Sequence, residues 1–233
     1  MKATNTISPK SKIPPLENGD KLNRTEFERR YSAMPDVKKA ELIEGIVYMA
    51  SPLRITNHGN PHAKIITWLG NYWSATPEIE LGDNATVRLD LDNEPQPDAL
   101  LRIKAGGQST ISEDGYVEGA PELIVEIAAS SVSIDLHQKL KVYRRNQVQE
   151  YLVWRVDDGE FDWFRLQSGE YVQLEPNSNN IVCSQFFPGL WLDKTALLLT
   201  GNLAEVLAVL QQGLASQEHQ DFVQKSTKKS NQI

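Results

Sequence analysis

The order of the predicted elements indicates an α/β (α+β) domain built on a mixed β-sheet that helices flank. Helix-like and strand-like segments alternate through residues 25–143, and the short apolar runs at 97–103 and 121–128 have the length of strands. A meander of strands separated by turn residues follows residue 150. Alternation of this kind places helices against a sheet that contains both parallel and antiparallel strands.

The chain of 233 residues predicts one domain at 25–200, with less regular segments at both ends. Residues 1–24 are rich in Pro, Ser, Asn, Lys and Thr, and we expect a disordered tail there. Residues 201–215 predict a C-terminal amphipathic helix. The Gln-, Ser- and Lys-rich end at 216–233 predicts a flexible tail.

The composition is typical of a soluble globular protein, with 40% hydrophobic residues and a mean hydropathy of −0.42. No run approaches the ~18 apolar residues that a bilayer span requires, and the N-terminus lacks the apolar core of a signal peptide. We therefore expect a cytoplasmic protein with no membrane partner. Cys183 is the only cysteine, which excludes an intrachain disulfide and a cysteine-rich zinc site.

The net charge of −7 is unevenly distributed. Residues 1–24 contain five Lys and Arg against two Asp and Glu, and residues 216–233 contain three against two, which leaves about −11 on the middle of the chain. Phosphate binding depends on local Lys and Arg side chains. The acidic middle is therefore a poor general surface for nucleic acid.

The first elements are a short helix and a hairpin. Residues 25–34 predict a helix with Thr25 as its N-cap, ended by the proline that follows. The β-rich runs at 39–49 meet at Gly45, which supplies the tight turn of a hairpin. Apolar residues at helical spacing in 62–73 predict a helix that packs on the core.

The middle of the chain predicts three strands, a loop and a helix, and two of the strands are the apolar runs. Residues 85–91 alternate with period two, which indicates a half-buried strand. The strand at 97–103 is followed by a loop at 104–119, which has little apolar content. The strand at 121–128 then leads to a helix at 135–143.

The last third predicts strands at 150–156, 161–166 and 171–174, with Asp-Gly and Ser-Gly turns between them. A closing edge strand is expected at 184–192. The leucine-rich stripe of a helix at 203–214 has two interpretations: it packs on its own sheet, or it serves self-association as a homodimer.

Two carboxylates in the apolar strands are the first indication of chemistry, because a buried charge is costly without a partner. Glu126 and Ala128 share one face of their strand, and Asp98 shares a face with Arg102 in the preceding strand. If these strands pair, Asp98 and Glu126 meet near one end. When two carboxylates are held close together without a cation, one of them must take up a proton. Binding of a hard divalent ion such as Mg²⁺ between them is a simpler explanation than protonation.

A lysine in the next helix completes the candidate site. At about 100° per residue, Lys139 lies roughly 65° from the centre of the apolar stripe and Lys141 roughly 130° away. Lys139 therefore flanks the buried face and reaches toward the sheet, whereas Lys141 is expected in water. The candidate catalytic residues are Asp98, Glu126 and Lys139, with Asp98 and Glu126 as metal ligands.

Each of these residues also has a purely structural interpretation. Asp98 follows Pro97 and is typical of a turn or a strand start. Glu126 would pair with a cation such as Arg102, and Lys139 would lie along the surface with its ammonium group in water. The combination of the three is more specific than any one of them.

Three other residues are candidates of lower rank. Glu41 and Glu44 are candidates for a third carboxylate, although Glu44 also suits a turn position before Gly45. His62 is a base, a ligand or an N-terminal helix residue, and His58 is assigned to a loop. Glu44, His62 and Glu41 are therefore named as supporting site residues.

An ordered series of segments resembles the Uma2 family, formerly the domain of unknown function 820, which has the PD-(D/E)xK restriction-endonuclease-like fold. The series covers about residues 25–195 in the expected order. Its members are Glu41-Leu-Ile-Glu-Gly45, the helix opening at His62, Pro97-Asp98, Pro121-Glu-Leu-Ile-Val-Glu126-Ile, Asp135-Leu-His-Gln-Lys139-Leu-Lys-Val-Tyr143, Glu150-Tyr-Leu-Val-Trp and Phe187-Pro-Gly-Leu190.

The resemblance implies a restriction-endonuclease-like mixed sheet flanked by helices, with a C-terminal strand meander and a metal-dependent phosphodiesterase core. Asp98 and Glu126 match the family's metal-binding acids, which implies Mg²⁺, with Mn²⁺ as a second possibility. The chain departs from the general nuclease pattern because Ala128, not lysine, stands two residues after Glu126. Lys139 stands at the position of the lysine that the next helix supplies in such cases.

The implied activity is that of an endonuclease that hydrolyses phosphodiester bonds of nucleic acid, with DNA as the first candidate substrate. A rival from another class is a catalytically inactive protein of the same fold with an interaction or regulatory role. The acidic middle and the missing in-strand lysine favour the rival. A third alternative is a nuclease that depends on a partner for DNA contact, because the chain has no evident helix-turn-helix or zinc module.

Overall fold

The computed structural model describes residues 13–49, 52–129 and 131–230. Its centre is a six-stranded mixed sheet in the order β11-β10-β9-β8-β5-β3, in which only the pair β8–β9 is parallel. The strands are β3 (Ile79–Asp83), β5 (Ala99–Ile103), β8 (Leu123–Ala128), β9 (Glu150–Arg155), β10 (Glu160–Gln167) and β11 (Glu170–Gln173). The expected mixed sheet and the C-terminal meander β9–β10–β11 are confirmed.

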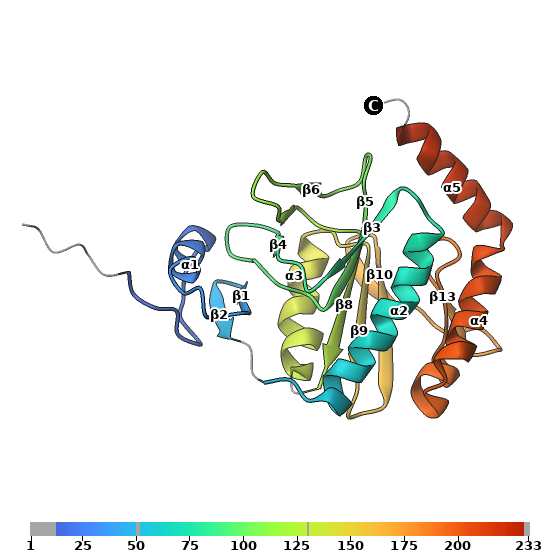
Figure 1. Ribbon diagram of the computed structural model, residues 1–233, viewed down its shortest axis with the longest axis horizontal. Coiled ribbons are helices and arrows are strands. Elements are labelled where there is room, and N and C mark those ends of the chain that lie inside the picture. Colours follow the sequence, from blue (N-terminus) through green and yellow to red (C-terminus); the bar gives the residue numbers. More distant parts are fainter. Residues whose placement is uncertain (1–12, 50–51, 130, 231–233) are drawn as a thin grey trace, which may run out of the picture.

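Strand β8 lies at the middle of the molecule, and all six of its residues are buried. Helices α2 (Asn60–Ser74) and α4 (Leu203–Leu214) cover one face of the sheet, and α3 (Leu140–Arg145) covers the other (Figure 1). A strand covered on both faces is apolar along its whole length. Glu126 is the one exception in β8, and it lies on the α3 face with Ile124 and Ala128.

The N-terminal hairpin forms as expected, from β1 (Ala40–Ile43) and β2 (Ile46–Met49). Its turn residues Glu44 and Gly45 both have positive φ, at 52° and 74°. Two consecutive residues with positive φ are the requirement of a type I′ turn, whose twist matches that of the flanking strands.

The segment before the hairpin differs from the expected disordered tail at 1–24. Leu16 is buried at 3% exposure, and Gly19 N–H donates to the Val47 carbonyl at 2.8 Å. The described part of this segment therefore packs along β2, while residues 1–12 lie outside the described residues. Helix α1 (Arg24–Tyr31) is capped by Asn23 rather than by Thr25, because the Asn23 side chain accepts from Glu26 N–H at 3.0 Å.

Two predictions in the middle of the chain, the strand at 85–91 and the loop at 104–119, differ from the structure. The alternating stretch 85–91 contributes only β4 (Val87–Arg88), because the chain turns at Asp90, whose carboxylate accepts from Asp92 N–H. Strand β4 pairs instead with one of two short strands in the expected loop 104–119, which also pair with each other in this separate sheet. These are β6 (Thr110–Ile111) and β7 (Val117–Glu118). The sixth strand of the main sheet is β3, and no strand was predicted from the sequence at these residues.

Two π-helical segments lead into the helices that flank the sheet. Segment η1 (Ile55–Gly59) precedes α2, and η2 (Ile134–Lys139) precedes α3. The wider π-winding alters the register expected at 135–143. Asp135 and Lys139 are buried there, whereas the expected apolar residues Leu136 and Leu140 are only half-buried.

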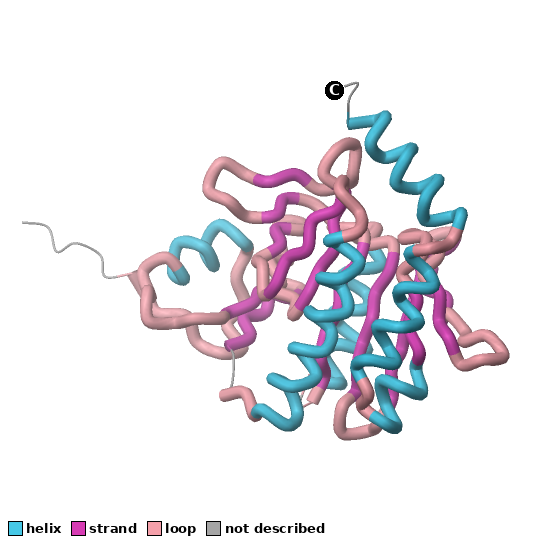
Figure 2. The backbone as a smooth tube through the Cα atoms, turned by 45° about the vertical axis from the view of Figure 1, so that its right-hand side comes forward, coloured by secondary structure: helices cyan, strands magenta, loops and turns pink. Residues whose placement is uncertain are grey.

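The C-terminal part differs from expectation in two places. The edge strand expected at 184–192 is a separate hairpin of β12 (Ile181–Cys183) and β13 (Trp191–Asp193). The chain turns at Pro188 and Gly189, and Gly189 has a positive φ of 86°. The short π-helical segment η3 (Ala196–Thr200) follows this hairpin and leads to α4. The flexible tail expected at 216–233 is helix α5 (Gln217–Ser230) as far as it is described (Figure 2).

The contacts of α4 and α5 explain why both helices form. The apolar stripe of α4 packs in the core beside α2, with Val206 and Leu210 at 1% and 0% exposure, so this stripe is not free for self-association. Phe222 of α5 stacks edge-on against Phe187. Among the described residues, no helix is long and apolar enough to cross a membrane.

Candidate functional site

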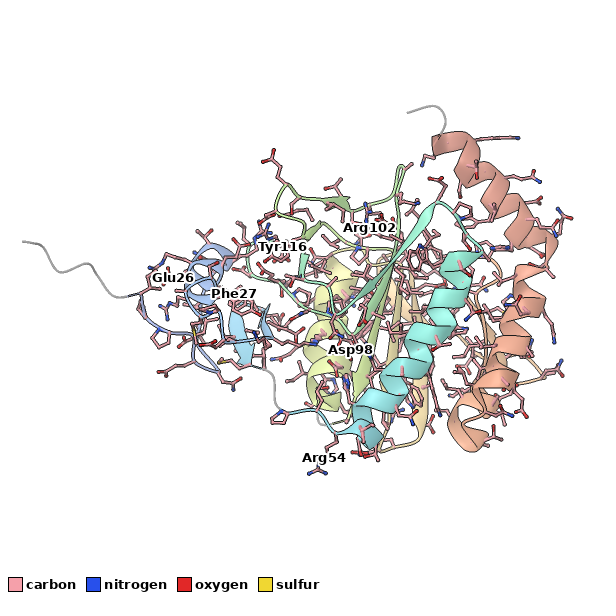
Figure 3. The ribbon with its side chains drawn as sticks, in the orientation of Figure 1. Glu26, Phe27, Arg54, Asp98, Arg102 and Tyr116 are labelled. Atoms are coloured by element: carbon pink, nitrogen blue, oxygen red, sulfur yellow. The ribbon has the colours of Figure 1, made fainter. Side chains whose placement is uncertain are left out.

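The sheet register brings the two predicted carboxylates together. In the antiparallel pair β5–β8, Ala99 lies opposite Val125 and Leu100 opposite Ile124. Asp98 precedes Ala99 by one residue and therefore faces Glu126, on the side of the sheet that α3 covers. Figure 3 labels Asp98 among the side chains beside this sheet.

Each oxygen of the Asp98 carboxylate has its own partner. Oδ2 accepts from the Ile127 N–H at 2.7 Å, and Oδ1 lies 3.1 Å from His58 Nε2 and 3.7 Å from Lys39 Nζ. Burial raises the pKa of Asp98, but the hydrogen bond from His58 and the charge of Lys39 outweigh it and lower this pKa to about 2. Asp98 is therefore an anion at neutral pH.

The ammonium group of Lys139 lies among three carboxylates on the same face. Its Nζ is 3.0 Å from Glu126 Oε1, 3.0 Å from Glu41 Oε1 and 3.6 Å from Asp135 Oδ1. The Tyr143 hydroxyl donates to Glu126 Oε1 at 2.7 Å. The Lys139, Glu126 and Asp135 side chains are at most 5% exposed, so these charges interact with little screening by water.

This cluster contains more acid groups than cations. Burial opposes the charge of Lys139, yet the carboxylates of Glu126, Glu41 and Asp135 raise its pKa well above the usual value. Burial raises the pKa of Glu126, Lys139 offsets part of that rise, and the neighbouring carboxylates add to it. Lys139 therefore stays charged, and the excess negative charge is relieved by a proton on Glu126 or by a further cation.

The donor set suits a hard divalent ion in its chemistry. Carboxylate oxygens are the ligands that Mg²⁺ prefers, and Glu126 Oε2 accepts no hydrogen bond from the part of the chain that the structure describes. Within the same described ranges, no three His, Cys, Asp or Glu side chains are arranged around one point as a metal site, because Lys139 lies between Glu41, Glu126 and Asp135. Asp98 and the free oxygen of Glu126 are the groups that fit an ion.

The supporting residues predicted from the sequence divide into near and distant ones. Glu41 belongs to the cluster through Lys139. His62 Nε2 lies 3.1 Å from the Asp98 backbone carbonyl and 3.0 Å from Asp83 Oδ1, so it contacts the peptide of Asp98 and not its carboxylate. Glu44 occupies the hairpin turn and pairs with Arg145 at 3.5 Å, away from the cluster.

Four residues of the cluster were missed as site residues: His58, Lys39, Asp135 and Tyr143. His58 was assigned to a loop but lies on η1, one helical turn before His62, and the two rings stack at 5.7 Å. The spacing of four residues in His58–His62 and Asp135–Lys139 was the available signal. The structural interpretation of Glu126 as a partner of Arg102 was wrong, because Arg102 pairs with Glu80.

Comparisons with known proteins place this chain in a family. The family model of Uma2, described as "Putative restriction endonuclease", matches residues 24–195. The solved structure of "a putative nuclease belonging to DUF820 from Anabaena variabilis ATCC 29413" is similar in fold. It is 15% identical, covers 78% of this chain and 97% of its own, and has a TM-score of 0.52. No curated protein matches. On the match over residues 24–195, the chain belongs to the Uma2 family.

Proposed function

We propose that the chain is a metal-dependent endonuclease that hydrolyses phosphodiester bonds of nucleic acid, with DNA as its first candidate substrate. The observation that supports the proposal is the buried contact between Lys139 and Glu126 beside Asp98, in a chain of a nuclease family. A buried lysine among carboxylates costs folding free energy. A catalytic role in phosphodiester hydrolysis accounts for why this costly arrangement is present.

In this proposal Asp98 and Glu126 hold a Mg²⁺ ion, or Mn²⁺ in its place. When bound, the ion supplies Lewis-acid activation of water and offsets the charge of the phosphate. Ile127 N–H and His58 fix the orientation of the Asp98 carboxylate. Lys139 remains charged and donates to an oxygen of the phosphate or to the attacking water, while Glu41 holds the lysine in position.

The test is cleavage of plasmid and linear DNA by the full chain with Mg²⁺ or Mn²⁺. Asp98→Ala and Glu126→Ala are each expected to lower the rate by about 100-fold or more, because each removes a metal ligand and a charge. Asp92→Asn is the matched control, because Asp92 is an exposed acid of the loop before Asp98. Cleavage that survives both alanine substitutions contradicts the proposal.

A second candidate is an inactive protein of the same fold with an interaction or regulatory role. Ala128 in place of the in-strand lysine and the occupation of the acid cluster by Lys139 favour it. Calorimetric titration with Mg²⁺ and Mn²⁺ separates the two candidates. Binding that Asp98→Ala abolishes supports the nuclease, whereas a folded chain that binds neither ion supports the inactive alternative.

A further inference from the structure

Exposed apolar side chains are grouped around a cavity at one end of the molecule, where the start of α2, the turn between β9 and β10 and segment η3 meet. The volume of this cavity is about 360 Å³. Leu199 and Ile55 are 80% and 78% exposed, the highest values of any large apolar side chain that the structure describes, and Leu53 is 66% exposed. Figure 1 shows the starts of α2 and α4 at this same end, so these side chains are not scattered over the surface.

The apolar surface continues from the rim into the cavity. Leu199 at the rim and the buried Trp154 and Leu197 all line it. Ile55 is the direct neighbour of Thr56, another lining residue. Single exposed apolar residues are normal on a protein surface, whereas a group of them around a hollow with a polar rim is typical of an interaction site.

One cation and one acid at the edges of this hollow have no ionic partner within the described chain. The half-buried Lys64 lines the cavity on the η3 side, with its Nζ 3.0 Å from the place that a Cβ at Gly201 would occupy. The exposed Asp157 belongs to the β9–β10 turn on the η1 side, where its Oδ1 accepts from the Asn57 amide. Lys64 and Asp157 form no ion pair with each other or with any other residue in the described ranges, so both charges are available to a partner.

These side chains form a surface that is complementary to itself, here called the η1–η3 surface and made of Leu53, Ile55, Lys64, Asp157 and Leu199. Stable interfaces have an apolar centre and a polar rim, which is the arrangement seen here. In a dimer with twofold symmetry each contact occurs twice, so a cation at one edge meets the acid at the other edge of the second copy.

A second copy of the chain is therefore the partner that this surface fits. The backbone of a nucleic acid fits less well, because the acids of the β9–β10 turn repel phosphate groups. We propose that two copies of the chain associate through the η1–η3 surface, with Ile55 and Leu199 at the centre. Lys64 of each copy then pairs with Asp157 of the partner subunit.

This surface is separate from the other groups to which a role has been assigned. The apolar stripe of α4 packs in the core and takes no part in it. The η1–η3 surface adjoins the candidate site only through segment η1, whose His58 contacts Asp98. The proposal goes beyond the proposed nuclease function and does not depend on it, because association is measured without any substrate.

The experiment is sedimentation equilibrium of the full chain, whose mass is 26.2 kDa, at micromolar concentrations. We expect the wild-type protein to sediment with about twice this mass. Leu199→Glu should raise the dissociation constant by about 100-fold or more, because it places a charge in the dry centre of the interface. Leu91→Glu is the matched control, because Leu91 is 70% exposed beside α1, and the dissociation constant should not change.

Reversal of the two charges tests the pairing itself. Lys64→Glu and Asp157→Lys should each raise the dissociation constant by about tenfold, because each brings like charges together across the interface. The double variant restores opposite charges and should regain most of the wild-type affinity. A monomeric wild-type protein at all concentrations, a Leu199→Glu protein that dimerises as the wild type does, or a double variant weaker than both single variants overturns the proposal.

Discussion

At the scale of single residues, Lys139 has the strongest effect on the candidate site. Its ammonium group contacts Glu126 and Glu41 at 3.0 Å and lies 3.6 Å from Asp135, with 5% of the side chain exposed. In so little water, the mutual repulsion of three carboxylates is only weakly screened. Lys139 therefore stabilises the fold and, in the proposed function, the charge of the phosphate.

The stability contribution of Lys139 can be measured against its neighbour. Lys139→Met is expected to lower the free energy of unfolding by about 3 kcal/mol, because it leaves buried acids without their cation. Lys141→Met, at an exposed position two residues on, should change it by less than about 0.5 kcal/mol. Urea unfolding at neutral pH provides both values, and equal effects of the two substitutions would contradict this account.

At the scale of elements, the π-helical segments determine which polar side chains reach the site. Segment η1 presents His58 to Asp98, and η2 turns Asp135 and Lys139 toward Glu126. A π-helix has a wider turn than an α-helix and is often found at functional sites. The two segments precede different helices on opposite faces of the sheet. Each of them therefore supplies polar side chains to the site from its own face.

Helix α5 is a second element whose stability depends on a single side chain. His219 is 5% exposed and its ring packs edge-on against Tyr72. His219 Nδ1–H donates to the Leu214 carbonyl at 3.0 Å, and Nε2 lies 3.1 Å from Thr76 Oγ1. Burial lowers the pKa of His219, although the bond to Leu214 offsets part of the decrease.

The lowered pKa of His219 predicts a pH dependence of stability. The unfolded chain binds a proton at this residue more readily than the folded chain, so the free energy of unfolding should fall as the pH drops below about 6.5. His219→Gln cannot titrate and should reduce this decrease between about pH 7 and about pH 5. His137→Gln, at an exposed histidine, should keep the wild-type slope in urea unfolding. Identical slopes for all three proteins would contradict the prediction.

At the scale of the whole molecule, the family match ends at residue 195, and α4 and α5 extend the core beyond it. Figure 2 shows both helices along one side of the molecule. The backbone of α4 passes directly against the β12–β13 hairpin at Gly213 and Gly189. A side chain at residue 213 would overlap the Gly189 carbonyl and lie 2.9 Å from Trp191 Cγ.

This close approach predicts that substitution by alanine has opposite effects on the free energy of unfolding at two helical glycines. Gly213→Ala should lower the free energy of unfolding by about 2–3 kcal/mol, because a backbone carbonyl cannot move aside as a flexible side chain can. Gly70→Ala in α2 should raise it by about 0.5–1 kcal/mol, because the nearest atom, Leu81 Cδ2, is 3.9 Å away and alanine favours the helix. Chemical denaturation measures both, and a neutral Gly213→Ala protein would show that the two elements do not meet so closely.

The sequence by itself determined the features that repeat with a local period. Alternation of faces in 97–103 and 121–128 predicted that Asp98 and Glu126 meet if their strands pair, and the register β5–β8 puts them opposite each other. The 3.6-residue period preferred Lys139 to Lys141 on the buried side of the helix, and the expected stripe packs on the core, with Tyr143 buried and Leu136 and Leu140 half-buried. These patterns are visible because each depends on neighbours only a few residues away.

The tertiary structure alone decided which distant groups meet. The contact of His58 with Asp98 spans 40 residues, and that of Lys139 with Glu41 spans 98. Helix α5, polar along much of its length, forms because Phe222 and His219 pack on residues far away in the chain. A polar side chain satisfies its charge with whatever partner the fold brings near, and tertiary packing can order a segment of weak local preference. Local patterns therefore identified the central acids and the lysine, whereas packing determined the rest of their surroundings.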